Sequence, residues 1–181
     1  MPGNRRYKLP TEERLTRSAI HYLERYASSS ANLRKVLERK IIKACMAHDR
    51  DPAEFSPLID AVLEKCSKAG FLDDQAYAET KTRSLRRRGG SQRKIEAQLT
   101  AKGVDRAIIE SALRQDEQTD LSAAHIFARR RRLGPYRSAD DRHERRDKDL
   151  AAMCRAGFSY EVARQVIDAS NDDGRRTKAS D

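Results

Sequence analysis

An internal repeat constrains the fold of this chain more than any other feature of its sequence. One pattern of apolar residues around a glycine occurs twice, 54 positions apart. The two copies read Leu99-x3-Gly103-Val104-Asp105-x2-Ile108-x3-Ala112-Leu113 and Met153-x3-Gly157-Phe158-Ser159-x2-Val162-x3-Val166-Ile167. In each copy a helix ends at the glycine, an apolar residue follows, and Asp or Ser can cap the next helix. The pattern predicts one helical unit that is built more than once.

A third copy precedes these two. Leu33 and Leu37, followed by a helix from Pro57, fit the pattern once an insertion near residues 43–55 is allowed. We therefore expect an all-α chain of nine short helices in three tandem three-helix repeats. Only 38% of the residues are hydrophobic, fewer than the roughly 45–50% of average globular domains. Each repeat has a thin core and is expected to need contacts with its neighbours.

The three repeats are expected at residues 11–70, 71–116 and 117–170. A basic arm at residues 1–10 precedes them. The tail at residues 171–181 has little to bury, and we expect it to be disordered.

Cap signals and apolar spacing place the helices within these repeats. The first helix opens at Thr11, and its expected buried stripe is Leu15, Ala19, Tyr22, Leu23 and Tyr26. Ser56 is the predicted N-cap of the helix that starts at Pro57. The charged run at 137–149 is predicted to be an exposed helix that becomes buried only at Leu150.

The central segment carries the densest positive charge. A helix that begins at Asp73 is expected to end at Gly89 and Gly90, and Ser91 can cap the next helix. Seven basic residues and no acidic ones lie between positions 81 and 94, namely Lys81, Arg83, Arg86, Arg87, Arg88, Arg93 and Lys94. Free backbone N–H groups at the new helix start would add to the attraction for phosphates or carboxylates.

A second basic run ends a later helix, before Leu133-Gly134-Pro135. Its members are Arg129, Arg130, Arg131 and Arg132, and Arg137 follows the turn. With the central cluster, these residues are the candidate nucleic-acid or partner contacts. A solvated charged face is the alternative, although ordinary surfaces mix the two signs. Tyr136 in the turn could stack on a base or have a structural role.

The net charge of +10 predicts a polyanionic partner such as DNA, RNA or a nucleoprotein. No apolar run approaches the roughly 20 residues of a membrane-spanning helix, and the first ten residues lead into no signal-peptide core. The widely spaced Cys45, Cys66 and Cys154 are typical of a reducing compartment, where we expect them to be small core residues. These features favour a cytoplasmic protein without membrane contact.

No residue pattern points to catalysis, a cofactor or a metal. The four histidines are scattered, and no phosphate-binding glycine loop occurs. Cys45 and His48 form only half of a zinc spacing. Asp73 and Asp74 are better explained as a helix cap and a partner of the helix dipole than as an acid–base pair. We expect a binding protein without a cofactor, and not an enzyme.

From about residue 11 to residue 169 the chain resembles the RecX family of bacterial regulatory proteins. The first matching segment contains Ala19, Tyr22-Leu23, Arg25, Ser28 or Ser30, Leu33, Leu37 and Lys40. The second and most specific is Gly70-x-Leu72-Asp73-Asp74-x2-Tyr77-Ala78, followed by the basic turn and Ile95-x3-Leu99-x2-Lys102-Gly103-Val104. The third is Gly157-Phe158-Ser159-Tyr160.

This resemblance implies three tandem three-helix repeats in an elongated, curved molecule that performs no catalysis. It implies binding to the RecA nucleoprotein filament, with inhibition of ATP hydrolysis, strand exchange and co-protease activity. It thereby implies a part in recombination, DNA repair and the SOS response. The expected partners are the RecA filament and single- and double-stranded DNA, contacted by a monomer. The alternative is a freestanding, sequence-nonspecific DNA- or RNA-binding helical protein.

Overall fold

A computed structural model describes residues 7–170, which form helices and connecting turns with no strand in that range. The all-α prediction is therefore confirmed. The predicted disordered tail and the first six residues of the basic arm lie outside the described residues. Two compact units divide the chain: residues up to 78 with 100–108, and 79–99 with residues from 109 onward. No helix in the described part has the length and hydropathy needed to span a bilayer.

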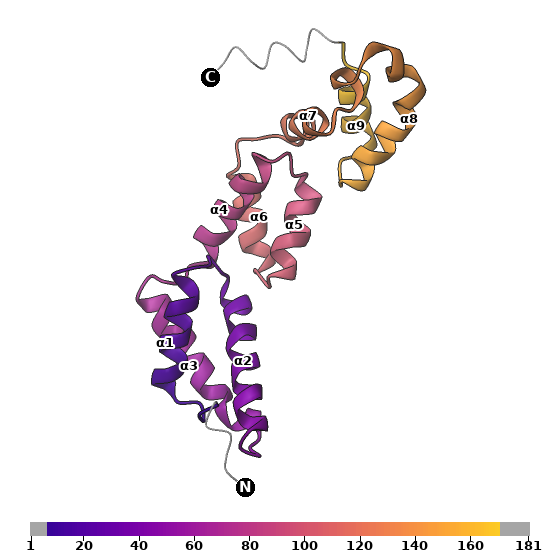
Figure 1. Cartoon of the computed structure of the whole chain (residues 1–181). Helices are drawn as coiled ribbons and strands as arrows, with labels where there is room; N and C mark the ends of the chain where they lie inside the picture. Colours follow the sequence, from indigo (N-terminus) through magenta and orange to yellow (C-terminus); the bar gives the residue numbers. More distant parts are fainter. Residues whose placement is uncertain (1–6, 171–181) are drawn as a thin grey trace. The chain divides into compact units, whose positions relative to one another are not determined.

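Nine α-helices and two 3-10 helices follow one another within residues 7–170 (Figure 1). They are α1 (Glu12–Leu23), α2 (Ser30–Met46), η1 (Pro52–Phe55), α3 (Ser56–Lys68), α4 (Asp74–Arg86), α5 (Gln92–Ala101), α6 (Arg106–Arg114), α7 (Asp120–Arg131), η2 (Gly134–Tyr136), α8 (Ala139–Arg155) and α9 (Tyr160–Ile167). In order, they form three sets of three α-helices, as the repeat predicts.

The first set packs around a core of apolar side chains from α1, α2 and α3, in which Leu33 and Leu37 are fully buried. Two local predictions are wrong here. Tyr26 is 58% exposed, because α1 already ends at Leu23. Ser56 is not the cap of α3, because η1 runs directly into that helix.

A serine at the start of α2 connects the first set to the second. Ser29 caps α2 by accepting a hydrogen bond from the Asn32 N–H (3.2 Å), and its hydroxyl donates to the carbonyl of Lys102 (2.5 Å). The neighbouring Ser30 N–H donates to the carboxylate of Asp74 at the start of α4 (2.7 Å). Asp74 therefore caps another helix, a role that its local sequence did not predict.

The second unit repeats this arrangement between the second and third sets. Ser91, the predicted cap of α5, accepts from the Lys94 N–H (3.3 Å) and donates to the carbonyl of Ala156 (2.8 Å). The Gln92 N–H donates to the carboxylate of Asp120 at the start of α7 (2.8 Å). We call these two arrangements the first and second serine junctions.

A glycine stop lies against each serine junction. Gly103 has φ +71°, and a Cβ added there would lie 2.5 Å from the Cβ of Ala31. Gly157 has φ +95°, and a Cβ there would lie 2.5 Å from the hydroxyl oxygen of Ser91. The repeated glycines thus end their helices and also permit close packing at the junctions.

The last set contains the charged run that was predicted to be exposed. Its core gathers small and apolar side chains of α7, α8 and α9, including Met153 and Val166. Asp149 contradicts the prediction, because it is only 2% exposed. Its carboxylate accepts from the Gly134 N–H (2.9 Å) and from the guanidinium of Arg137 (2.8 Å).

The cysteines divide between core and surface. Cys45 and Cys66 are buried, as expected of small core residues, and burial raises the pKa of the Cys66 thiol. Cys154 is exposed, which contradicts the same expectation. Across residues 7–170, no three His, Cys, Asp or Glu side chains converge on a position that could hold a metal ion.

Candidate nucleic-acid interface

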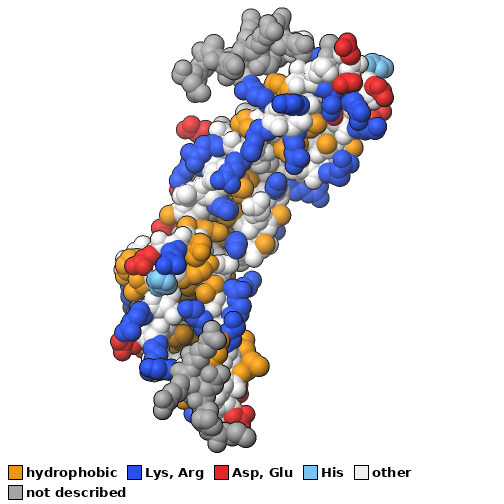
Figure 2. Space-filling view, in the orientation of Figure 1, with side chains coloured by type: hydrophobic (Ala, Val, Ile, Leu, Met, Phe, Trp, Pro, Cys, Tyr) orange, Lys and Arg blue, Asp and Glu red, His pale blue; other side chains and the backbone are white. Residues whose placement is uncertain are grey.

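All the predicted contact residues lie in the second unit, but they do not share one environment. The exposed members are Arg83, Arg87, Arg88, Arg93, Lys94, Arg129, Arg130, Arg131 and Arg132. Lys81 and Arg137 are half-buried, and Arg86 is buried. Figure 2 shows Lys and Arg side chains gathered on the visible face of this unit.

Four of the exposed cations line one groove of about 530 Å³, which we call the basic groove. Its lining residues are Leu85, Arg88, Gly89, Gly90, Lys94, Gln98, Phe127, Arg130 and Arg131. None of them is acidic, so the groove brings together four positive charges without a lining carboxylate. Such a surface attracts an extended polyanion.

One wall of the basic groove is formed by the end of α4, the α4–α5 turn and the first turns of α5, and the other by the C-terminal half of α7. The walls meet at Gly89, which has φ +78°. A Cβ added at Gly89 would lie 2.6 Å from the backbone nitrogen of Phe127 and 2.9 Å from the carbonyl oxygen of Ala123. Only glycine allows the turn and α7 to approach this closely.

Two arginines of α7 are held by contacts at the groove. Arg130 donates to the backbone carbonyl of Arg88 (3.0 Å), which holds the Arg130 side chain against the α4–α5 turn. The guanidinium carbon of Arg131 lies 5.9 Å from the ring centre of Phe127, within the range of a cation–π contact. These contacts keep both side chains beside the groove and leave them exposed.

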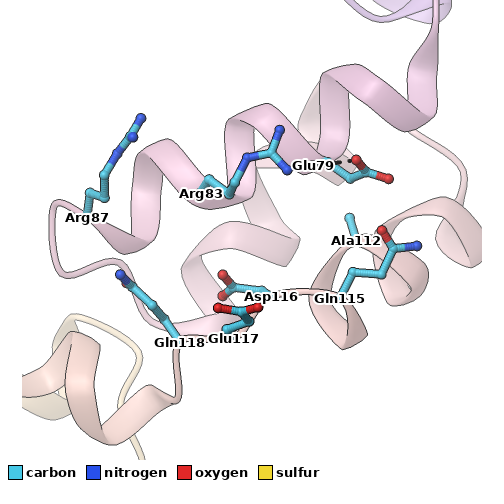
Figure 3. Close-up of a pocket in the computed structure, with 8 residues that line it drawn as sticks. All are labelled: Glu79, Arg83, Arg87, Ala112, Gln115, Asp116, Glu117 and Gln118. Atoms are coloured by element: carbon cyan, nitrogen blue, oxygen red, sulfur yellow. Dashed lines mark ion pairs between the residues drawn. The ribbon is translucent and has the colours of Figure 1, made fainter.

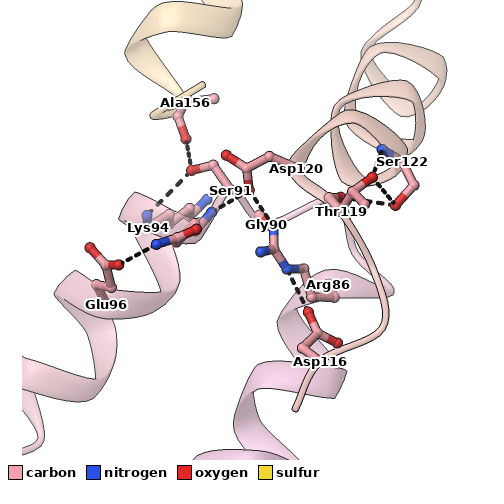
Figure 4. A network of polar contacts seen from close by, with 11 residues as sticks. Arg86, Gly90, Ser91, Lys94, Glu96, Asp116, Thr119, Asp120, Ser122 and Ala156 are labelled. Carbon is pink, nitrogen blue, oxygen red and sulfur yellow. Dashed lines mark hydrogen bonds and ion pairs between the residues drawn. The ribbon is translucent and has the colours of Figure 1, made fainter. Parts of the chain in front are cut away.

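Arg86 contradicts the prediction that it belongs to the contact surface. Its side chain is 4% exposed, and its Nε donates to the carboxylate of Asp116 (2.8 Å). Its NH1 forms an ion pair with Asp120 and donates to the carbonyl of Gly90 (3.1 Å) (Figure 4). A guanidinium that is buried and held by these contacts is not part of the exposed contact surface.

The predicted contribution of the α5 N-terminus is also corrected. The Gln92 and Lys94 N–H groups already donate to Asp120 and Ser91, so these two groups are not free for an external anion. These two N–H groups therefore add nothing to the attraction for a polyanion at this turn.

Arg83 and Arg87 line a different pocket, of about 380 Å³ (Figure 3). Its lining is Glu79, Arg83, Arg87, Ala112, Gln115, Asp116, Glu117 and Gln118, which mixes both signs of charge. Arg83 lies 3.8 Å from the carboxylate of Glu79. The structure thus separates these two arginines from the basic groove.

The turn after α7 is held by internal contacts. Arg137 pairs with the buried Asp149, and the hydrogen bonds of this pair raise the pKa of Arg137. The Tyr136 hydroxyl lies 3.1 Å from Nδ1 of His125, and the guanidinium of Arg129 lies 5.4 Å from the Tyr136 ring centre. These contacts give Tyr136 a structural role.

Sequence reasoning missed the apolar floor of the groove and the carboxylates behind it. Leu85 and Phe127 line the groove, whereas Asp116 and Asp120 neutralise Arg86. One signal was available: the segment between α6 and α7 is acidic, with Asp116 and Glu117 in it and Asp120 at the start of α7.

Comparisons with known proteins agree on one family. A protein-family model described as "RecX, second three-helix domain" matches residues 73–113 of this chain. "Regulatory protein RecX" of Myxococcus xanthus is 37% identical over 171 residues, covering 93% of this chain and 91% of the relative. The protein of the same name from Agrobacterium fabrum is 36% identical, covering 83% and 79%. A crystal structure of regulatory protein RecX has the same fold, with a TM-score of 0.64 at 21% identity over 87% of this chain and 72% of that one.

Proposed function

Because this chain belongs to the RecX family of regulatory proteins, we propose that it binds the RecA nucleoprotein filament and inhibits it. The inhibited activities are ATP hydrolysis, strand exchange and the co-protease activity. Inhibition works by occupancy: the protein docks on the filament and performs no chemistry there.

The basic groove is the observation that supports this proposal. Arg88, Lys94, Arg130 and Arg131 place four cations around it with no lining carboxylate. Guanidinium groups match phosphate oxygens with paired hydrogen bonds. The groove therefore contacts phosphates of the DNA strand within the filament, while other surfaces contact RecA.

A RecA ATPase assay tests the proposal. We expect inhibition of DNA-dependent ATP hydrolysis at protein concentrations far below those that coat the DNA. The double variant Arg88→Glu, Arg130→Glu should lose most of this inhibition, since it places two carboxylates in the groove. Lys35→Glu with Arg39→Glu, two exposed positions on α2, makes the same charge change outside the groove and should retain it.

The second candidate is a freestanding nucleic-acid-binding protein, which the net charge of +10 and the groove also favour. In that case inhibition would require saturation of the DNA and would be relieved by added competitor DNA. Inhibition that persists when competitor DNA is added favours the filament.

A further inference from the structure

We propose that Arg86 is a positioning residue of the basic groove. It binds no partner, but it fixes the positions of the two cationic walls relative to each other. This inference rests on the proposed function, because it assumes that the groove contacts phosphates. The experiment distinguishes a failure of the positioning role of Arg86 from a failure of the proposed phosphate contact.

Arg86 connects the two walls through one side chain. Its NH1 donates to the carbonyl of Gly90 in the α4–α5 turn (3.1 Å) and pairs with Asp120, the first residue of α7. Its Nε donates to Asp116 in the segment between α6 and α7 (2.8 Å). Asp120 in turn accepts from the Gln92 N–H of α5 (2.8 Å). The turn and α7 are thus fixed to the same guanidinium.

The first serine junction shows that a helix junction of this kind forms without such an arginine. Ser29 and Asp74 there make the same hydrogen bonds as Ser91 and Asp120. Glu24 stands five residues before Ser29, as Arg86 stands five before Ser91, and it is exposed. The buried guanidinium is therefore an addition to the second serine junction, the one beside the basic groove.

The direction of α7 decides where its arginines lie. Arg130 and Arg131 are ten and eleven residues beyond Asp120, which is about 15 Å along the helix. A tilt of about 10° at Asp120 would move them by more than 2 Å, beyond the distance tolerance of a hydrogen bond. The start of α7 must therefore be fixed if the two walls are to contact successive phosphates at the same time.

Charge alone cannot explain the role of Arg86. The side chains of Arg86 and Asp116 are 4% and 5% exposed, and the two aspartates more than neutralise the guanidinium. Lysine keeps the charge but lacks the planar fork, so it cannot reach the three acceptors in the same directions. Arg86→Lys therefore tests geometry at constant net charge.

The test measures affinity for a fluorescein-labelled single-stranded oligothymidylate across about 50–200 mM salt. Arg86→Lys is compared with Arg39→Lys, the same change at an exposed position of α2 outside the groove. Asp120→Ala is compared with Asp147→Ala, which removes one charge at a side chain that is 94% exposed. Circular dichroism confirms that each protein is folded, and Asp120→Ala carries the test if Arg86→Lys does not fold.

We expect Arg86→Lys to weaken binding. It should also reduce the magnitude of the slope of log affinity against log salt by about 1.4, because the phosphate contacts of Arg130 and Arg131 are lost at about 0.7 each. Asp120→Ala should weaken binding although it makes the protein more positive. Arg39→Lys and Asp147→Ala should bind like wild type. Wild-type affinity and slope in folded Arg86→Lys and Asp120→Ala, with only a lower melting temperature, would overturn the positioning role.

Direct contact variants separate this result from the proposed function. Arg88→Gln and Arg130→Gln should each reduce the salt slope by about 0.7. If neither variant weakens binding, the groove is not the phosphate site and the proposed function fails at this point, whatever Arg86→Lys does.

Discussion

Neighbouring arginines of one basic run have opposite roles at the residue scale. Arg88 lies at the surface of the basic groove, whereas Arg86 is buried against Asp116 and Asp120. The sequence could not separate them, because the carboxylates that bury Arg86 lie 30 and 34 positions away. The burial of Asp149 could not be predicted for the same reason, because a run of charged residues does not show which side chain points into the core.

A surface pair on the last helices predicts a pH effect. Arg146 donates two hydrogen bonds to Asp168 (2.7 Å each), which hold the pKa of Asp168 below its usual range. The stability from this carboxylate is fully present above about pH 4, the unfolded-state pKa, and is lost as the pH falls through the lower folded-state pKa. Asp168→Asn should therefore lower the urea midpoint at neutral pH.

The difference between wild type and Asp168→Asn should shrink as the pH falls below about 4. Asp147→Asn, which removes a longer ion pair to the same arginine (3.5 Å) at a side chain that is 94% exposed, is the control and should lower the midpoint much less at neutral pH. A difference that stays constant down to strong acid would contradict the assigned pair.

At the scale of single elements, the sequence predicts most helix ends. Thr11, Asp73, Ser91 and Ser159 accept hydrogen bonds from the first turns of their helices, as their positions predict. These signals succeed because a cap is a local interaction. Ser56 fails because a preceding 3-10 helix supplies the first turn of α3.

The serine junctions predict unequal costs for three similar substitutions. Ser29→Ala and Ser91→Ala each remove a cap and also the donor to a carbonyl of the next helix set. Each should lower the free energy of unfolding by about 2 kcal/mol, the sum of a cap and a partly buried hydrogen bond. Ser159→Ala removes an exposed cap alone and should cost about 1 kcal/mol. Urea titration measures all three, and equal losses would show that the second bond contributes nothing.

At the scale of the whole molecule, the repeat predicts the order of the helices, whereas the groove could not be predicted. The three sets of helices follow from glycine stops, caps and apolar spacing, all of which are local. The groove depends on contact between a turn near Gly89 and α7, and on a helix direction fixed by Arg86. Such contacts between sets leave no periodic signal in the sequence.

The proposed contact between the basic groove and DNA phosphates predicts how the affinity of the whole chain for DNA depends on salt. Four cations contacting a single strand give a slope of log affinity against log salt of about −2.8. Arg88→Glu with Arg130→Glu should reduce its magnitude by at least about 1.4. A much steeper slope that the double variant retains would place the DNA contacts elsewhere.

The first serine junction also has a consequence for synthesis on the ribosome. Ser29 and Ser30 leave the exit tunnel long before Asp74 and Lys102, their hydrogen-bond partners. The amino-terminal unit includes residues 100–108, so a nascent chain cannot complete it until that stretch has been translated. The core of α1, α2 and α3 is therefore available early, whereas the serine junction is completed only when part of the second repeat has been translated.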